Sequence, residues 1–405
     1  MTIAEDAQAV QGDLVDLRRR LHREPELGLQ LPRTQERVLE ALRGLPLEVT
    51  TGQGLTSVTA VLRGEATTGG ARRRVLLRGD MDALPVSEHT GLDYAAAGDT
   101  MHACGHDLHT AMLVGAAHVL TAQRDKLAGD VVFMFQPGEE GHDGARHMVD
   151  EGVLDAAGDR VDAALALHVT SGMLPRGVFA ARPGPVMAAA DVLRVTVNGA
   201  GGHGSSPHRA KDPIPAACEM VVALQTFVTR RFDVFDPVVI TIGAFHSGTA
   251  HNVIPESAYF EATVRSFSHE SHQRVLEESV RVCRGIAAAH GLDVDAVAEE
   301  LYPVTVNDPG QVAAVASTVA ELYGAGRYFT LPNPIPGSED FSRVLDAVPG
   351  AMVFLGATPS DRDPATAAFN HAPEATFDDG VIADGVGVLA SFAQRQLTPA
   401  SALES

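Results

Sequence analysis

Apolar and polar positions alternate along the chain with two different periods, which predicts both helices and strands. Apolar residues recur at three- and four-residue spacing from Val10 to Leu21, as in an amphipathic helix, and Pro25 ends the run. Four short apolar runs are typical of buried strands: residues 74–78, 130–135, 163–167 and 351–356. Helical patterns separate several of them: residues 108–123, 144–154 and 309–323. Strands that alternate with helices favour an α/β fold, a sheet with helices on both faces.

Two local expectations concern the predicted helices. Thr34 is expected to be the N-cap of a second helix that carries Val38, Leu39 and Leu42. Several histidines outside the candidate site fall in helical segments and are expected to be solvated: His22, His147, His269, His272 and His290.

The pattern changes at about residue 185. Residues 191–197 alternate apolar and polar, as a half-exposed strand does. Asp212 and Pro213 then open a helix that runs to Thr229, with Asp212 as its N-cap. The remaining elements are expected in this order: strands at 238–245 and 258–266, a helix at 270–290 that Gly291 ends, and a strand at 293–301. This order predicts the split βαβ arrangement of a small α+β domain with one bare sheet face.

Two domains are therefore expected. The larger one is discontinuous and comprises residues 1–184 and 303–405, whereas the α+β domain is inserted at residues 185–302. The length of 405 residues agrees with two domains. The bare face or the edge strands of the inserted domain could make a dimer contact.

Composition restricts the setting in which the protein works. The chain is 45% hydrophobic, yet no apolar run approaches the ~20 residues that a membrane span needs. The first residues are acidic and lack a secretory signal pattern. Three widely spaced cysteines argue against a disulfide framework, so a cytoplasmic location is expected. A net charge of −21 makes nucleic acid and anionic membranes improbable partners.

The stretch from His102 to His109 holds the densest group of chemically active side chains. It contains three histidines, one cysteine and one aspartate within eight positions. Cys104 and His106 place a thiolate and an imidazole on one short loop, which suits zinc and similar divalent ions. The alternative is a helix N-terminus that is merely rich in polar groups.

Further candidate ligands lie at or beyond the ends of the predicted strands: Glu139 and Glu140, His168, and His371. Asp80 and Asp82, directly after a strand, are a further candidate for the site. Each alone has an ordinary explanation, such as a turn residue, a core histidine or a surface loop. Ligands of α/β sheets, however, gather at the carboxyl ends of the strands. This coincidence predicts a metal site there.

A hydrolytic metal site needs fixed ligands, an open position for water and a base. Of two adjacent glutamates, one can bind metal while the other takes a proton from the water. The remaining set comprises one thiolate, three imidazoles and one carboxylate, which is too many for one tetrahedral ion with an open position. It suits two ions ~3.5–4 Å apart. Zinc, manganese, cobalt and nickel all remain candidates.

Several motifs recur in an order that resembles the M20 metallopeptidase superfamily, specifically its amidohydrolase branch of hippurate hydrolases, N-acyl-amino-acid amidohydrolases and auxin-conjugate hydrolases. These motifs are residues 21–27 (LHREPEL), 102–107 (HACGHD), 136–141 (QPGEEG), 201–204 (GGHG) with Pro207 and His208, 252–255 (NVIP) and 337–341 (GSEDF). The cysteine in the metal loop is specific to that branch. The resemblance covers nearly the whole chain and implies a zinc-exopeptidase-like catalytic domain with an inserted lid and dimerisation domain.

The resemblance also implies roles for individual residues. The implied metal ligands are Cys104, His106, Glu140, His168 and His371. Glu139 would be the general acid and base, Asp82 would orient a ligand, and Asp80 is not expected to be a ligand. His203 would bind the oxyanion across a dimer, and the substrate would be held by Asn252, Arg265, Gly337 and Ser338. Residues 169–172 and 372–374 depart from the family pattern, which leaves specificity open.

The leading hypothesis is metal-dependent hydrolysis of the amide bond in a small N-acyl amino acid by a homodimer or a dimer-based oligomer. Two alternatives within the superfamily are a dipeptidase or carboxypeptidase-like peptidase and an N-acetyl-diaminopimelate deacetylase. A third alternative makes Cys104 a nucleophile with His106 or His109 as its base. A fourth is a metal-containing binding protein without turnover.

Overall fold

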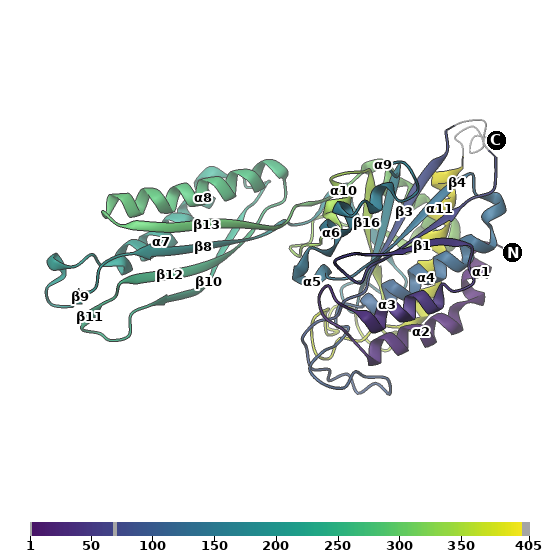
Figure 1. Ribbon diagram of the computed structural model, residues 1–405, viewed down its shortest axis with the longest axis horizontal. Helices are drawn as coiled ribbons and strands as arrows, with labels where there is room; N and C mark the ends of the chain where they lie inside the picture. Colours follow the sequence, from purple (N-terminus) through teal and green to yellow (C-terminus); the bar gives the residue numbers. More distant parts are fainter. Residues whose placement is uncertain (1, 68–70, 399–405) are drawn as a thin grey trace. The chain divides into compact units, whose positions relative to one another are not determined.

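The computed structural model describes residues 2–67 and 71–398, which form two compact units (Figure 1). The larger unit comprises Met1–Gly184, Val306–Asn333 and Arg343–Ser405, and the smaller one comprises Pro185–Thr305 and Pro334–Ser342. The ends of the predicted larger domain, residue 1 and residues 399–405, lie outside the described residues.

The larger unit is built on an eight-stranded mixed sheet. In spatial order its strands are β1 (Leu47–Thr51), β2 (Val58–Arg63), β4 (Gly129–Gln136), β3 (Arg73–Asp80), β5 (Ala163–Thr170), β16 (Gly350–Gly356), β6 (Phe179–Ala181) and β15 (Tyr328–Thr330). The four central strands β4, β3, β5 and β16 run parallel to their neighbours within this group. On the two sides of this group, β2 is antiparallel to β4 and β6 is antiparallel to β16, whereas the edge strand β15 is parallel to β6.

Helices cover both faces of this sheet, so the predicted fold class is confirmed. One face packs against a core to which six helices contribute: α1 (Ile3–Ala9), α2 (Gln11–Arg23), α3 (Pro32–Ala41), α4 (His106–Ala122), α9 (Pro309–Tyr323) and α11 (Ile382–Leu397). Val131, Phe133 and Phe135 of β4 belong to this core, whereas Val132 and Met134 between them face the other side and are equally buried. Helix α6 (Gly144–Asp150) contacts β4. Strands buried on both faces read as continuous apolar runs, which explains their visibility in the sequence.

Two of the predicted element boundaries are wrong. Helix α3 begins at Pro32, so Thr34 lies inside its first turn and is not the N-cap. The Glu26 carboxylate accepts hydrogen bonds from the Thr34 backbone N–H at 2.8 Å and from its hydroxyl at 3.0 Å, which satisfies an N-terminal donor without a local cap. Strand β5 continues to Thr170, so His168 lies within the strand and not at its end.

Two histidines expected in solvent are buried. In α2, His22 Nδ1 lies 2.8 Å from Asp107 Oδ2, and only 1% of the residue is exposed. In the smaller unit, His272 Nε2 lies 2.9 Å from the buried Asp191 carboxylate. The expectation of solvation was therefore wrong for both, whereas the other three helical histidines are exposed: His147, His269 and His290.

The smaller unit has the predicted strand–helix–strand–strand–helix–strand order. Its antiparallel sheet runs β10 (Val239–Ser247), β12 (Ser257–Arg265), β8 (Ala190–Asn198) and β13 (Asp293–Tyr302). Helices α7 (Pro213–Arg231) and α8 (His269–Ala289) pack together against one face of this sheet (Figure 1). Asp212 caps α7 as expected, because its carboxylate accepts a hydrogen bond from the Ile214 N–H. Phe260, Ala262 and Val264 lie in the core, as the alternation of β12 predicts.

The remaining short elements are β7 (Gly184–Met187), β9 (Gly202–His203), β11 (Val253–Ile254), β14 (Thr305–Asn307), α5 (Glu139–His142) and α10 (Ser342–Leu345). Strands β9 and β11 form an antiparallel pair within the smaller unit. None of the helices within residues 2–67 and 71–398 is long and apolar enough to cross a membrane.

Candidate metal centre

The five predicted metal ligands come together in the larger unit at one edge of its sheet. Strands β3, β4 and β5 are parallel neighbours, so their carboxyl ends meet there. His168 lies near the end of β5, and the glutamate pair follows β4. Cys104 and His106 lie where α4 begins, and the segment between β16 and α11 supplies His371.

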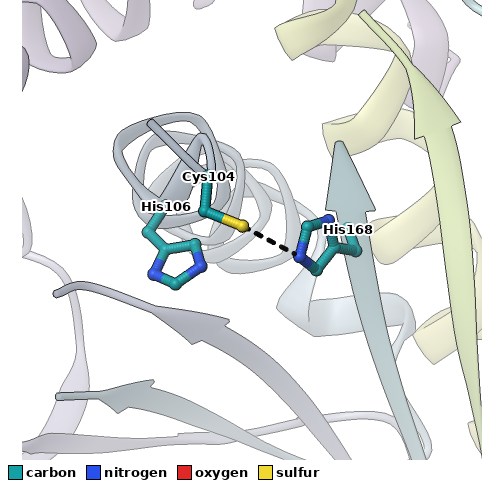
Figure 2. A group of neighbouring side chains, drawn as sticks. All are labelled: Cys104, His106 and His168. Carbon is teal, nitrogen blue, oxygen red and sulfur yellow. Dashed lines mark hydrogen bonds between the residues drawn. The ribbon is translucent and has the colours of Figure 1, made fainter. Parts of the chain in front are cut away.

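Short distances join these side chains. The Cys104 sulfur lies 3.5 Å from His168 Nε2 (Figure 2) and 3.2 Å from His371 Nε2. Glu140 Oε1 lies 3.2 Å from the same His371 nitrogen and 3.9 Å from His106 Nε2. Residues more than 260 positions apart in the sequence therefore present donor atoms to one small volume.

Cys104 belongs to two groups of three ligands. His106 and His168 complete one group, and Glu140 and His371 complete the other; within each group the ligand atoms lie within 4.8 Å of one another. A thiolate shared by two such groups can hold two cations side by side, as dinuclear hydrolytic sites require.

Buried polar atoms without partners indicate that this pocket suits a cation. Both ring nitrogens of His106 are buried and have no hydrogen-bond partner among the described residues. Such atoms cost free energy unless something satisfies them. Divalent ions bound by the thiolate, imidazole and carboxylate groups would do so, and these donor types match those that zinc and related ions prefer.

The electrostatics of the centre also favour a bound cation. Burial alone would raise the pKa of the Cys104 thiol, but His168, together with His106 and His371, holds that pKa well below its ordinary value. Hydrogen bonds to Cys104 and Glu140 raise the pKa of His371 to about 10. The thiolate and carboxylate thus create a negative potential that favours positive charge at this position.

The local backbone explains how neighbouring residues take different directions. Gly105 has φ +83°, and a Cβ there would lie 2.3 Å from the Val169 side chain, so only glycine fits between the two ligands of the loop. Glu140 has non-helical angles (φ −74°, ψ 77°) that interrupt α5 directly after Glu139. His371 has φ +74°, an uncommon conformation for a residue with a side chain.

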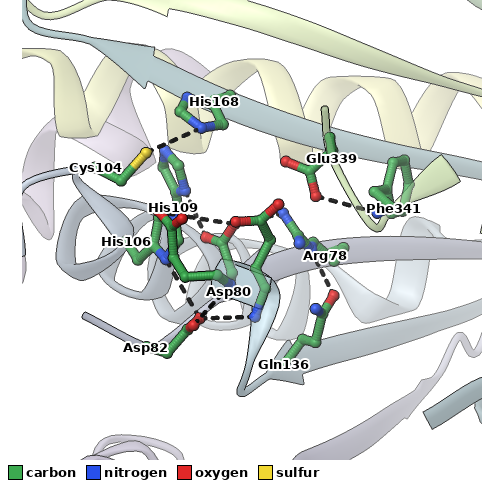
Figure 3. Close-up of polar contacts among 12 residues, drawn as sticks. Arg78, Asp80, Asp82, Cys104, His106, His109, Gln136, His168, Glu339 and Phe341 are labelled. Carbon is green, nitrogen blue, oxygen red and sulfur yellow. Dashed lines mark hydrogen bonds and ion pairs between the residues drawn. The ribbon is translucent and has the colours of Figure 1, made fainter. Parts of the chain in front are cut away.

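Asp82, which lies beside His106 in Figure 3, connects the metal loop to the glutamate pair. Its Oδ1 accepts a hydrogen bond from the Glu139 N–H and its Oδ2 one from the Glu140 N–H, both at 3.0 Å. His106 Nδ1 lies 3.4 Å from Oδ1 of the same carboxylate. One carboxylate therefore contacts the backbone of both glutamates and one imidazole, and its orienting role stays a prediction.

Asp80 and His109 form a second link that the sequence did not predict. Asp80 lies 2.6 Å from Arg78 Nη1 and 2.6 Å from His109 Nδ1 (Figure 3). The Val169 N–H donates to His109 Nε2 at 2.8 Å, so Nε2 carries no proton and Nδ1–H donates to Asp80. Asp80 also lies 3.6 Å from His106 Nε2. The available signal was the spacing of His106 and His109, which places both on one helix face.

The other five predicted site residues belong to the smaller unit: His203, Asn252, Arg265, Gly337 and Ser338. His203 lies on β9 beside Val253 of β11, and the Gly204 N–H donates to the Asn252 carbonyl at 2.8 Å. Arg265 ends β12. Their part in the site stays a prediction.

An α/β sheet whose strand ends gather a thiolate, imidazoles and carboxylates around two cation positions defines a class of metal-dependent hydrolases. Residues 76–395 match the model of peptidase family M20/M25/M40, and the chain belongs to this family. It is a metal-dependent amide hydrolase, so the predicted enzyme class is confirmed.

Three similar proteins show how far the likeness extends. The chain is 36% identical to thermostable carboxypeptidase 1 of Saccharolobus solfataricus over 359 residues, which cover 87% of this chain and 88% of that one. It is 33% identical to hippurate hydrolase of Campylobacter jejuni over 401 residues, 98% of this chain and all of the other. A solved dinuclear metal-binding peptidase of the M20 family from Bacillus subtilis has a TM-score of 0.80 and 32% identity, and the match covers 96% of this chain and 99% of that one. The resemblance to the amidohydrolase branch is thereby confirmed.

Proposed function

We propose that the protein hydrolyses the amide bond of N-acyl amino acids, such as hippurate-like, N-acetyl or indolyl-acyl conjugates. The observation that carries this proposal is the pair of ligand groups that share Cys104, with Glu139 directly beside the Glu140 carboxylate. The similar hippurate hydrolase and carboxypeptidase support the choice of substrate. Both activities cleave an amide whose amine side is an amino acid with a free carboxylate.

In this proposal the metal ligands are Cys104, His106, Glu140, His168 and His371. Two divalent ions bound there would supply positive charge that lowers the pKa of a water molecule toward ~7. Zinc, manganese, cobalt and nickel all suit this mixed set of donors.

Glu139 is the general acid and base of the proposed reaction. It is 6% exposed, and Asp82 fixes its backbone N–H. The Glu139 carboxylate accepts a proton from the attacking water, and the water oxygen bonds to the acyl carbon. The carbon–nitrogen bond then breaks, and Glu139 donates the proton to the leaving amine. The proton balance closes, because Glu139 ends the cycle as a carboxylate.

The smaller unit completes the proposal as a lid and dimerisation domain. His203 binds the oxyanion at the site of a second subunit, and Asn252, Arg265, Gly337 and Ser338 help hold the substrate. The active form is then a homodimer. All three cysteines are free thiols, which supports a reducing, cytoplasmic location.

The test is a substrate screen on stripped and reconstituted enzyme. Chelated protein is reloaded separately with each of the four metals and assayed on hippurate, N-acetyl and indole-acetyl amino acids, and dipeptides. We expect no turnover without metal and preferred cleavage of N-acyl amino acids with it. Activity that survives chelation would favour Cys104 as a nucleophile. Cleavage of dipeptides alone would move the assignment to a peptidase, and metal binding without cleavage of any compound would favour a binding protein.

A further inference from the structure

We propose that Asn370 is a positioning residue of the metal centre. Its side-chain amide holds the Cys104 thiolate between the segments that carry His168 and His371. This inference rests on the proposed function, because it takes Cys104 as a metal ligand. No motif discussed above gives Asn370 a role.

The amide nitrogen of Asn370 faces three acceptors from two other segments. Nδ2 donates to the Val169 carbonyl at 3.0 Å and to the Cys104 carbonyl at 3.3 Å. It also lies 3.7 Å from the Cys104 sulfur, a distance within the range of hydrogen bonds to sulfur, so its two protons are shared among three acceptors. The same NH₂ group therefore touches the backbone and the side chain of one ligand and the backbone next to another.

The opposite end of the amide fixes its orientation. Oδ1 accepts a hydrogen bond from the Ser171 backbone N–H at 2.9 Å. A backbone N–H can only donate, so the oxygen of the amide must face Ser171 and the NH₂ group must face Cys104. The Ser171 hydroxyl lies 3.1 Å from Oδ1 but also 2.8 Å from the Ala368 carbonyl, to which it can give its single proton. The orientation thus depends on backbone atoms and not on that hydroxyl.

Each of the three joined segments carries a ligand within one residue of the contact. Cys104 is itself a ligand, Val169 follows His168, and Asn370 precedes His371. The His371 N–H donates to the Ala103 carbonyl at 2.9 Å, a second tie between the same loops. Left-handed backbone at a residue such as His371 persists only where its surroundings enforce it. The amide of Asn370 supplies part of that enforcement.

Loss of the amide would affect the thiolate in two ways. The sulfur would lose a hydrogen bond that withdraws charge from it, and the three segments would lose their common tie. Groups that support metal ligands from outside typically change metal affinity about 10- to 100-fold when they are removed. A residue that only filled space would not alter the electronic state of the sulfur.

The test compares Asn370→Leu with Ser171→Ala in protein loaded with cobalt. Leucine keeps a similar side-chain volume but has no donor, whereas Ser171→Ala removes a hydroxyl from the same contact and leaves every bond from Asn370 to Cys104 and Val169. The readouts are the thiolate-to-cobalt charge-transfer band and the cobalt affinity, measured by competition with a chromophoric chelator.

We expect Asn370→Leu to lower cobalt affinity about 10- to 100-fold and to move the band to longer wavelength, because the sulfur lone pair rises in energy. Ser171→Ala should leave both unchanged. An Asn370→Leu protein with the wild-type band and affinity overturns the proposal. So does a variant whose metal-free melting temperature falls while its band stays in place, because that result shows a purely structural role.

If Asn370→Leu does not fold, the same measurements on Asn370→Ala decide between these outcomes. The wild-type spectrum separates this inference from the proposed function. Absence of any thiolate band in cobalt-loaded wild-type protein rejects Cys104 as a ligand and with it the proposed centre. A normal wild-type band with no change in the variant rejects only the role of Asn370.

Discussion

Replacement of Asp82 by asparagine tests whether one carboxylate aligns the catalytic glutamate with the metal loop. Asp82 uses its two oxygens for the two backbone N–H groups of Glu139 and Glu140, at 3.0 Å each. Asparagine has nearly the same shape but only one oxygen, so one of these N–H groups must face an NH₂ group instead of an acceptor.

The size of the effect follows from this single lost bond. A hydrogen bond to a charged group contributes about 1.5–3 kcal/mol, and about 1.4 kcal/mol corresponds to a tenfold change in rate. We therefore expect Asp82→Asn to lower kcat/KM about 10- to 150-fold on the preferred N-acyl amino acid.

The assay is steady-state hydrolysis by enzyme whose metal content has been measured. Asp99→Asn is the matched control, because Asp99 is an exposed carboxylate that accepts a bond from the Ser87 hydroxyl at 3.0 Å. The control should keep the wild-type kcat/KM. Equal values for Asp82→Asn and Asp99→Asn would refute the orienting role of Asp82.

Two further predictions concern the buried charges behind the metal loop. Arg18→Met should lower the free energy of urea unfolding by about 3–5 kcal/mol, because Arg18 and Asp107 form a fully buried ion pair at 2.7 Å. Arg33→Met should cost less than about 1 kcal/mol, because the Arg33 side chain that pairs with Glu26 is exposed to solvent. Equal losses in the two variants would contradict this reasoning. Burial alone would lower the pKa of His22, but Asp107 raises it above its ordinary value of about 6.5. Protonated His22 therefore stabilises the fold below about pH 6.5, and this contribution disappears as the pH rises through the raised pKa. The difference in unfolding free energy between wild type and His22→Gln should shrink as the pH rises from about 6.5 through the raised pKa of His22, and an increase would contradict the pairing.

Elements with strong local signals could be predicted from the sequence. The helix expected at residues 309–323 is α9, and the Asp212 cap begins α7 as expected. Hydrophobic periodicity and helix capping depend on residues that are close together in the chain, so both signals can be read from a single sequence. No strand was predicted at Leu47–Thr51 or Val58–Arg63. Most of β1 is exposed, so it lacks the apolar run that a buried strand shows.

The burial of polar residues was harder to predict, because it depends on contacts between distant segments. His22 lies in the predicted first helix, but its burial depends on Asp107, which is 85 positions away. His272 is buried in the same way by Asp191. The Thr34 cap failed because the competing acceptor, Glu26, comes from outside the helix.

Some features of the candidate site could likewise be predicted from the sequence, and others could not. Its ligand types could be inferred because strand ends of a parallel sheet share one edge, which constrains even residues that are far apart. The bridges from Asp80 to His109 and from Asn370 to Cys104 could not be inferred, because they join loops whose approach only the folded chain defines.

Glu139→Gln provides the most direct test of metal-dependent hydrolysis with Glu139 as the base, since it removes the proposed base and keeps all five proposed ligands. Two quantities are measured on the same preparation: bound metal per chain and kcat on the best N-acyl amino acid. We predict two bound ions, as in the wild type, and a kcat lowered about 10²- to 10⁴-fold. A variant with both ions bound and a rate near that of the wild type would contradict the proposed mechanism.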